Sequence, residues 1–405
     1  MGRTACATRA CSFCGGRLTP EDTMLASRSA YICTGCIKMG CILAQASYMT
    51  RQQPRPPHPD AIRAELDRHV VGQDRIKRVI SVAVYNHYKR TDTYGSSRER
   101  CSISKSNILL VGPTGSGKTL IAQTMARFLN VPFAVADATT LTEAGYVGED
   151  VEGILLRLLH NCDFDVDKAQ RGIVYIDEID KISRKQGGPM VTRDISGEGV
   201  QQALLKILDG TVAAVPCLGG KRFPDADYIH LDTTDILFIC GGSFEAATRA
   251  AVTCTPTGSV GFTKAASTRS RGPITARELI QHGLIPELVG RLPIVEVLQE
   301  LSEDDLVRIL VEPSGALLGQ YRLLLGMESA HLTISTSGLR RIARRCIRLE
   351  IGARGLRSVM EHLLVDAMYE MPTANGSTAG VMLDERVVHT LRGPFMLHAR
   401  HAAHT

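Results

Sequence analysis

Residues 106–120 carry the clearest chemical pattern in this chain of 405 residues. They read Ser-Asn-Ile-Leu-Leu-Val-Gly-Pro-Thr-Gly-Ser-Gly-Lys-Thr-Leu and fit the spacing G-x-x-x-x-G-K-S/T. The apolar residues 108–111 predict a buried strand, and helix-forming residues follow from 120 to 129. Glycines let backbone N–H groups turn inward around an anion, and the helix N-terminus adds a positive dipole. A strand, a glycine loop and a helix in this order predict a phosphate-binding loop.

Two side chains of this loop are expected to take part in the chemistry. Lys118 would reach the β- and γ-phosphates of a nucleotide, and the Thr119 hydroxyl would ligate Mg²⁺. A glycine-rich turn with a surface lysine is the alternative, which the flanking strand and helix disfavour. The residues predicted to contact the nucleotide here are Gly112, Pro113, Thr114, Gly115, Ser116, Gly117, Lys118, Thr119 and Leu120.

A pair of acids downstream predicts what happens to that nucleotide. Four apolar residues, 173–176, end in Asp177 and Glu178. Such a run predicts a buried parallel strand that delivers both carboxylates to the carboxyl edge of a sheet, where ligands bind in open α/β folds. We expect Asp177 to hold Mg²⁺ and Glu178 to orient and deprotonate the attacking water. Because Glu178 supplies a base for water, the pair predicts hydrolysis rather than phosphoryl transfer to a small acceptor.

Four cysteines near the N-terminus form a metal-like array. Two C-x-x-C pairs at their separation predict four thiolates around a tetrahedral Zn²⁺ with no open position, hence a structural ion. A domain of this size builds little apolar core, so the metal is expected to hold it together. Unrelated buried cysteines are the alternative, and Cys6 and Cys41 are expected to be free thiols. The predicted zinc ligands are Cys11, Cys14, Cys33 and Cys36.

Composition limits the protein class. A hydrophobic share of 44% supports real cores, and the length predicts two or three domains. No segment approaches the roughly 18 apolar residues of a membrane span, and the N-terminus lacks the core of a signal peptide, so we expect a cytoplasmic protein. The net charge of +5 is too small to imply nucleic-acid binding. Twelve cysteines, mostly scattered, predict thiols and a metal in a reducing compartment rather than disulfides.

The elements around the phosphate loop position further candidates. Residues 51–59 hold four prolines and predict a stiff linker. Two amphipathic helices follow, and the break between them at Val70 and Val71 could wall an adenine ring or pack in the core. Downstream, Arg291 stands between a glycine and a Leu-Pro break. It is either a surface charge or a residue that reaches the nucleotide of a neighbouring subunit.

Two loops have compositions that suggest contact with other proteins. Tyr146 and Val147 lie between two glycines, which predicts an aromatic side chain on a mobile loop; an ordinary turn is the alternative. The Thr/Ser/Gly-rich stretch 253–274 holds an apolar triplet, Val260, Gly261 and Phe262. A loop of this length is functional or disordered, and the exposed triplet suggests a docking site.

Taken in order, these motifs resemble the ClpX family, the AAA+ protein-unfolding ATPases of the Clp protease. The resemblance extends from about Cys11 to Pro372. No single motif is unique to the family, but their order is. The motifs are the four-cysteine array, Val71–Gln73, the phosphate loop, Gly145–Gly148, Ile176–Lys181, Arg193–Gly199, Gly290–Pro293 and Gly352–Arg357.

The resemblance implies a homohexameric ring that hydrolyses ATP, unfolds tagged proteins and threads them into a ClpP-type peptidase, without being a peptidase itself. It implies that Tyr146, with Val147, grips the substrate chain, and that residues 190–199 form a second pore loop. Arg291 would be an arginine finger that acts on a neighbouring subunit. Arg354 would be a sensor that couples the nucleotide state to rotation of the small domain.

The family pattern also assigns the remaining candidates. Val70 and Val71 match its adenine-side box, the triplet 260–262 matches its peptidase-docking loop, and the zinc domain matches its dimerising, adaptor-binding module. Three positions depart from it. The docking triplet begins with valine instead of isoleucine, and Lys221–Phe223 replaces an Arg-Lys-His loop. No asparagine follows Ile239 as a first sensor, and Ser243 is the only polar side chain nearby.

The expected fold class is α/β: a large AAA+ P-loop domain with a parallel sheet, a mostly helical small C-terminal domain and a small N-terminal zinc-binding domain. Two alternatives remain: a DNA-acting P-loop motor, and a stand-alone remodelling chaperone without a peptidase. The glycine-flanked aromatic and the lack of a DNA-binding module disfavour the first.

The expected segments are a zinc domain at 1–50, a linker at 51–59, the large domain at 60–298, the small domain at 299–392 and a tail at 393–405.

Overall fold

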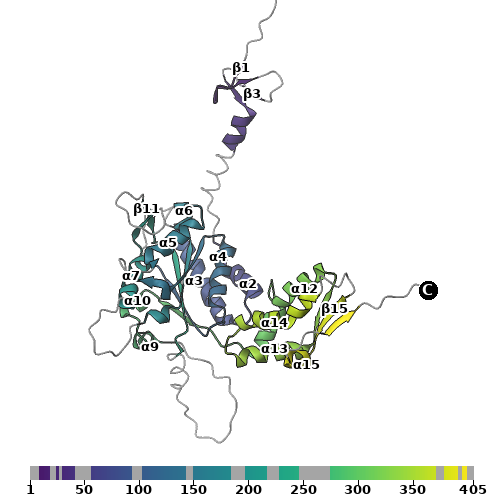
Figure 1. The fold of residues 1–405 in the computed structure, drawn as a ribbon. Coiled ribbons are helices and arrows are strands. Elements are labelled where there is room, and N and C mark those ends of the chain that lie inside the picture. The colour runs from purple at the N-terminus through teal and green to yellow at the C-terminus, as the bar shows by residue number, and fades with distance from the viewer. Residues whose placement is uncertain are drawn as a thin grey trace, which may run out of the picture. The chain divides into compact units, whose positions relative to one another are not determined.

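The computed structural model divides the chain into two compact units, Met1–Pro56 and Pro57–Thr405. The division falls within the linker expected at 51–59. Figure 1 shows the elements of each unit, which we describe separately. The residues expected in the substrate-gripping loop (146 and 147), the entrance loop (221–223) and the docking triplet (260–262) lie outside the described residues. The residues that the structure describes are 9–18, 24–26, 30–41, 56–93, 103–142, 149–183, 197–216, 228–245, 274–370, 378–390 and 395–398.

The first unit consists of short strands and one helical segment around its cysteines. Cys11 is the only buried apolar side chain among its described residues, and Phe13 is 75% exposed. This small core agrees with the expectation that a metal holds the unit together. Residues 34–41 are helical. Two antiparallel ribbons pair β1 (Arg9–Ala10) with β2 (Arg17–Leu18) and β3 (Met24–Ala26) with β4 (Tyr31–Cys33).

A five-stranded parallel sheet forms the centre of the second unit, as the sequence predicts. Its strand order is β13-β5-β12-β9-β6, and every neighbouring pair is parallel. Ile108–Val111 forms a strand, as expected. The sequence also predicts strands at 131–135 and 235–240, and the observed strands there begin two residues later. The strands are β5 (Ile108–Val111), β6 (Phe133–Asp137), β9 (Ile173–Asp177), β12 (Leu237–Gly242) and β13 (Ile294–Val297).

Helices cover both faces of this sheet, and its three central strands, β5, β12 and β9, are buried along almost their whole length. Leu109 and Val111 pack in one core, and Ile108 and Leu110 pack in the other. Figure 1 shows α5 and α7 on one side of the sheet and α3 and α4 on the other. One group of helices is α2 (Pro59–His69), α3 (Asp74–Thr93) and α4 (Lys118–Leu129). The other is α5 (Val151–His160), α7 (Glu198–Asp209), α9 (Ala276–Gln281) and α10 (Pro286–Gly290).

Shorter elements complete the large domain. The antiparallel pair β10–β11 stands outside the main sheet, and neither this pair nor α5 is expected from the sequence. None of the helices among the described residues is long and apolar enough to cross a membrane. The shorter elements are η1 (Ala138–Thr140), β7 (Leu141–Thr142), β8 (Glu149–Asp150), α6 (Val166–Ala169), η2 (Ile179–Ile182), β10 (Val212–Pro216) and β11 (Tyr228–Asp232).

The small C-terminal domain is mostly helical, as predicted, and has its own core. The sequence Ser-Glu-Asp-Asp at 302–305 predicts a capped helix start, and Ser302 and Asp305 form a capping box there. The domain also holds a three-stranded sheet that the sequence does not predict, and β16 of this sheet lies in the segment expected as a tail. The helices are α11 (Glu303–Val311), α12 (Leu317–Met327), α13 (Thr336–Arg348), α14 (Arg354–Glu370) and α15 (Glu385–Thr390). The strands are β14 (His331–Ile334), β15 (Thr378–Leu383) and β16 (Phe395–His398).

Candidate active site

The loop between β5 and α4 is held between three other segments. The Gly112 N–H donates to the Gly242 carbonyl at 3.0 Å, which ties the loop to the end of β12. A Cβ at Gly112 would lie 2.8 Å from Cβ of Leu298. Gly115 has φ +77°, and a Cβ there would lie 2.7 Å from the Ile351 carbonyl oxygen. Side chains at these positions would collide, so the glycines of the motif let the interdomain hinge and the start of α14 approach the loop closely.

Lys118 is the first residue of α4 and turns back over the loop. Its ammonium donates to the carbonyl oxygens of Gly112 at 2.7 Å and of Pro113 at 3.0 Å. Burial lowers the pKa of Lys118, and the carboxylate of Asp177 acts against that shift. The ammonium is therefore held at the mouth of the loop, where the sequence predicts phosphate binding.

Other groups of the loop also suit a phosphate. Helix α4 begins after Gly117 without a side-chain cap, so its first N–H groups can bind an anion. The Ser116 hydroxyl is buried and has no hydrogen-bond partner among the described residues. A phosphate oxygen would satisfy both features, because buried polar groups in native proteins are nearly always hydrogen-bonded. The loop therefore fits the phosphates of a nucleotide.

Strand β9 brings Asp177 next to Thr119, as its position at the sheet edge predicts. The Thr119 hydroxyl donates to Oδ2 of Asp177 at 3.4 Å. The other carboxylate oxygen, Oδ1, accepts from the Tyr175 hydroxyl at 3.1 Å and from the Glu178 N–H at 3.0 Å. A hydroxyl and a carboxylate oxygen side by side, next to a phosphate-binding loop, fit Mg²⁺, which prefers oxygen ligands.

Glu178 occupies a strained backbone position immediately after β9. Its φ of 55° and ψ of 34° place a residue with a side chain in the left-handed region. Such a conformation costs about 1–3 kcal/mol and is concentrated at functional sites. The side chain is exposed and adjoins Asp177 in sequence. This position suits a base that must reach a water molecule at the edge of the sheet.

The end of β12 is fastened to the same acidic loop. The Ser243 hydroxyl donates to Oδ2 of Asp180 at 2.8 Å, and the Ser243 N–H donates to Oδ1 at 3.0 Å. The side chain of Asp180 is also paired with Lys181 at 3.6 Å. The family pattern assigns no first sensor at this position. The two hydrogen bonds nevertheless connect Ser243, the residue after β12, to the loop that follows Asp177.

Arg354 begins α14 and brings the small domain to the phosphate loop. Gly352, two residues earlier, lies so close that a Cβ there would be 2.7 Å from the Thr114 carbonyl oxygen. Burial is the main cause of the lowered pKa of Lys118, and the positive charge of Arg354 lowers it further. Arg354 therefore acts electrostatically on Lys118, and its role as a sensor of the nucleotide stays a prediction.

Arg291 lies at the opposite end of β5 from the phosphate loop. Its carbonyl oxygen accepts from Nδ2 of Asn107, the residue that precedes β5, at 3.1 Å. Asn107 and Gly112 flank β5, and the five steps of about 3.3 Å between them separate the two ends of the strand by roughly 16 Å. The Arg291 side chain is half-exposed and pairs with Asp209, with 2.6 Å between Nε and Oδ1. Arg291 is therefore remote from the phosphate loop of its own chain.

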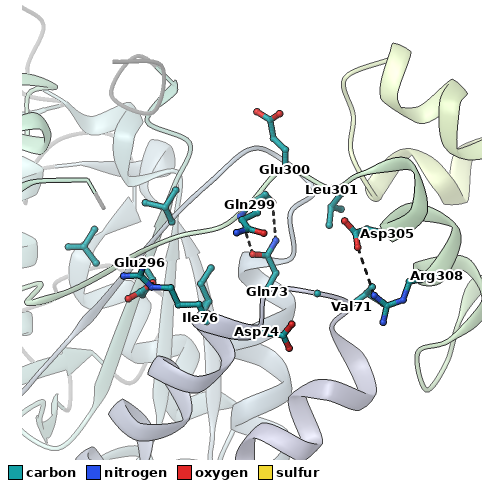
Figure 2. A pocket seen from close by; sticks show the side chains of 14 residues that line it. Val71, Gln73, Asp74, Ile76, Glu296, Gln299, Glu300, Leu301, Asp305 and Arg308 are labelled. Atoms are coloured by element: carbon teal, nitrogen blue, oxygen red, sulfur yellow. Dashed lines mark hydrogen bonds and ion pairs between the residues drawn. The ribbon is translucent and has the colours of Figure 1, made fainter. Parts of the chain in front are cut away.

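The hinge between the two domains adjoins a cavity of about 520 Å³, shown in Figure 2. Val71, Asp74, Glu296, Leu301 and Arg308 are among its lining residues, and none of the residues 112–119 is. The cavity therefore belongs to the hinge and not to the phosphate-binding loop. The two valines predicted to lie beside an adenine ring have different surroundings. Val70 is buried in the core beside α4, and Val71 lines the cavity.

Gln73 joins the start of α3 to this hinge through its side-chain amide. Its Nε2 donates to the Gln299 carbonyl at 2.9 Å, and its Oε1 accepts from the Gln299 N–H at 3.0 Å. Figure 2 shows these two bonds side by side. The Gln73 side chain is buried, and its backbone has φ +60°. One side chain thus satisfies both backbone groups of a hinge residue 226 positions away.

We expect Gln73→Leu to lower the free energy of unfolding by about 1–3 kcal/mol, because it strands the N–H and carbonyl of Gln299. The midpoint of urea or thermal unfolding measures this loss. Gln299→Ala is the matched control, since only the backbone of Gln299 takes part and its side chain is exposed. Equal stability of Gln73→Leu and the control would show that the amide pair contributes nothing.

The four predicted zinc ligands come together in the first unit. All their Sγ atoms lie within 4.8 Å of one another, and those of Cys14 and Cys33 are 3.8 Å apart. Thiolates about 2.3 Å from a tetrahedral zinc ion lie about 3.8 Å from one another. The cluster therefore fits Zn²⁺. Cys41 is an exposed free thiol outside it, as expected. The ligands are Cys11, Cys14, Cys33 and Cys36.

Backbone N–H groups point at the sulfur atoms of this cluster. The Cys33 N–H donates to Sγ of Cys11 at 3.4 Å, and the Cys36 N–H donates to Sγ of Cys33 at 3.4 Å. Backbone hydrogen bonds from Cys14 and Cys33 lower the pKa of the Cys11 thiol to about 6. The side chain of Cys33 raises the pKa of the Cys36 thiol to about 12. Amide donors of this kind stabilise thiolates, the form that binds zinc.

Three contacts in the site are absent from the sequence motifs. Tyr175 touches Asp177, Ser243 touches Asp180, and Gln73 binds the hinge. The first has a sequence signal, because residues two apart in a strand share a face. The other two join positions 63 and 226 residues apart, and no local pattern indicates such pairs.

Two comparisons with known protein families agree with this geometry. A family model described as an AAA domain of the Cdc48 subfamily matches residues 103–295, which include the phosphate loop, Asp177 and Glu178. A second model, described as the C-terminal D2-small domain of ClpB protein, matches residues 301–382, which include Arg354. The chain thus carries an AAA-type ATPase domain followed by a helical small domain that contacts its phosphate loop. Together these findings indicate that the protein is a Clp/Hsp100-type AAA+ ATPase.

Proposed function

We propose that this protein is an ATP-dependent unfoldase of the ClpX kind, which unfolds tagged proteins and passes them to a ClpP-type peptidase. One observation carries the proposal: the phosphate loop packs directly on residues 351–353 of the small domain. A change in the nucleotide bound at Lys118 would therefore alter the electrostatic environment of Arg354 at the start of α14. Coupling of this type converts ATP hydrolysis into movement of one domain against another.

In the hydrolysis step, water attacks the γ-phosphorus and the bond to the β-phosphate oxygen breaks. Glu178 takes the proton of the attacking water. Lys118 holds the β- and γ-phosphates, and Thr119 and Asp177 would hold Mg²⁺. When bound, this ion offsets the negative charge of the phosphates.

Negative charge on the phosphates in the transition state remains after Lys118 and Mg²⁺ are counted. A further positive group, from a neighbouring subunit, would offset it. Arg291 is the proposed donor, and it would act on the nucleotide of a neighbouring subunit. Its position at the far end of β5 supports action between subunits, since it stands away from its own phosphate loop. AAA+ ATPases of this family commonly form hexamers. A homohexamer would bring Arg291 of one subunit to the phosphates of the next, once its ion pair with Asp209 opens.

Contact with protein substrates is assigned to segments outside the described residues. Tyr146 and Val147 would grip the extended chain, and Val260–Phe262 would dock the peptidase. The zinc unit would bind adaptors or a second zinc unit. These assignments rest on the family resemblance. A cytoplasmic location without membrane or nucleic-acid partners is proposed from the composition, which lacks a signal-peptide core and a long apolar span and has a net charge of only +5.

The direct test combines the full-length protein with ATP, a ClpP-type peptidase and a stably folded protein that carries a degradation tag. The tagged substrate is expected to be degraded only when ATP, the full-length protein and the peptidase are all present. ATP hydrolysis without loss of the folded substrate, with or without the peptidase, would overturn the unfoldase proposal.

Tyr146→Ala is expected to slow unfolding far more than ATP hydrolysis, because the aromatic side chain would transmit force without touching the nucleotide. Loss of substrate fluorescence reports unfolding, and phosphate release reports hydrolysis in the same sample. Tyr369→Ala, at an 82% exposed tyrosine of α14, is the control. Parallel loss of both activities in Tyr146→Ala would argue against a gripping role.

A stand-alone remodelling chaperone is the second candidate, favoured by the match of residues 301–382 to the small domain of ClpB. Such a protein would unfold the substrate without any peptidase and release it. Omitting the peptidase from the same assay distinguishes the two functions, because only the ClpX-type unfoldase stimulates degradation when a ClpP-type peptidase is added.

A further inference from the structure

Tyr175 is a fully buried tyrosine in the centre of β9, and its hydroxyl reaches the acidic end of that strand. Residues two apart in a strand face the same side, so Tyr175 and Asp177 both face the side covered by α4. The hydroxyl donates to Oδ1 of Asp177 at 3.1 Å. A buried tyrosine hydroxyl normally requires a partner, and here the partner is a predicted Mg²⁺ ligand.

Neighbouring strand β12 leaves room for this hydroxyl. Residue 241 lies beside the end of β9, because Cys240 pairs with Ile176. Position 241 is a glycine, and a Cβ there would lie 2.0 Å from the Tyr175 hydroxyl oxygen and 3.2 Å from Oδ1 of Asp177. Any side chain at Gly241 would displace the hydroxyl from the carboxylate. The space for the Tyr175–Asp177 contact therefore depends on a second strand.

The contact distinguishes the two oxygens of Asp177. Oδ1 accepts two hydrogen bonds, from the Tyr175 hydroxyl and from the Glu178 N–H at 3.0 Å. Oδ2 is turned to the Thr119 hydroxyl, 3.4 Å away, at the start of α4. The two donors on Oδ1 fix the rotation of the carboxylate about its terminal bond. They thereby direct Oδ2 to the side of the phosphate loop.

We propose that Tyr175 is a positioning residue of the metal–nucleotide site, and that its hydroxyl holds Asp177 so that Oδ2, beside Thr119, is the oxygen presented to Mg²⁺. The inference rests on the proposed roles of Thr119 and Asp177 as Mg²⁺ ligands. Partners that orient metal-binding carboxylates typically contribute 10–100-fold to metal affinity or activity. We expect a contribution of about this size from the Tyr175–Asp177 hydrogen bond.

Tyr175→Phe tests the proposal, because it removes the hydroxyl and keeps the buried ring. In the full-length protein, the Mg²⁺ concentration that gives half-maximal ATP hydrolysis should rise by about 10–100-fold. A second readout needs no turnover: Mn²⁺ is titrated into the protein complexed with a non-hydrolysable ATP analogue and followed by electron paramagnetic resonance. The affinity for Mn²⁺ should fall by a similar factor, while analogue binding in the absence of a divalent cation stays unchanged.

Tyr88→Phe is the matched control. Tyr88 is also buried in the core on this side of the sheet, and its hydroxyl donates to the Arg171 carbonyl at 3.0 Å, away from the site. An unchanged Mn²⁺ affinity in folded Tyr175→Phe, or an equal loss in Tyr88→Phe, would overturn the proposal. A wild-type protein that binds Mn²⁺ and the analogue but hydrolyses no ATP would overturn the proposed function instead, and the titration would still decide the role of Tyr175.

Discussion

Glu178→Gln is expected to lower the rate of ATP hydrolysis by about 10²–10⁴-fold, the usual contribution of a positioned general base. Glutamine has nearly the same shape but cannot accept the proton of the attacking water. ATP binding should remain, because the phosphate contacts come from the loop and Lys118. Phosphate release measures hydrolysis, and binding of a fluorescent ATP analogue measures affinity.

The backbone of Glu178 makes this variant informative. Because its φ of 55° is strained for any residue with a side chain, glutamate and glutamine carry a similar backbone cost, and the substitution changes only the chemistry. Glu328→Gln, at an exposed position after α12, is the control and should hydrolyse ATP at the wild-type rate. Retained turnover in Glu178→Gln would remove Glu178 as the base and leave the other acids of the loop, Asp177 and Asp180, to be examined.

Cys14→Ser is expected to remove zinc from the first unit and to unfold it. The unit has only one buried apolar side chain among its described residues, so its burial of apolar surface cannot replace the metal. The binding free energy of structural zinc, which stabilises the folded state, is roughly 10–16 kcal/mol in zinc-finger peptides at neutral pH. Atomic absorption measures the zinc content, which should be one ion per chain in the wild type. Limited proteolysis reports whether residues 9–41 remain protected.

The control for this prediction is Cys41→Ser, since Cys41 is an exposed thiol of the same unit outside the cluster. It should keep its zinc and its protection. ATP hydrolysis should continue in Cys14→Ser, because the nucleotide-binding residues all lie in the second unit. Full zinc content in Cys14→Ser would show that the four sulfur atoms do not bind the ion together.

Local patterns were sufficient to predict the chemistry of the candidate sites. The phosphate loop, the two acids after β9 and the paired cysteines each occupy a short stretch whose spacing follows from one strand, one turn or one metal. The sequence also predicts β5 with its observed bounds and the capping box at Ser302, because both depend on neighbouring residues. For the same reason it predicts a parallel sheet, whose strands are apolar throughout when helices cover both faces.

Patterns of this kind failed where partners are distant or where the apolar signal is ambiguous. The small sheet of β14, β15 and β16 joins strands from three separate stretches, and its strands are short and partly exposed. Helix α5 contains a short apolar run at 154–159 that only Arg157 interrupts, and periodicity alone does not distinguish such a run in a helix from a buried strand. The strands β6 and β12 begin later than expected, because Val131 and Ile236 belong to turns, in which their N–H groups donate to the carbonyl oxygens of Ala126 and Thr233.

The sequence alone predicted which residues bind phosphate, Mg²⁺ and zinc, because those predictions depend on side-chain type and close spacing. Only the tertiary structure decided how they are oriented. It showed that the Tyr175 hydroxyl donates to Asp177 beside Gly241, that Gln73 is hydrogen-bonded to the hinge, and that residues 351–353 lie against the phosphate loop. These contacts join strands and domains far apart in the chain, and their geometry arises only when the sheet and both cores are packed.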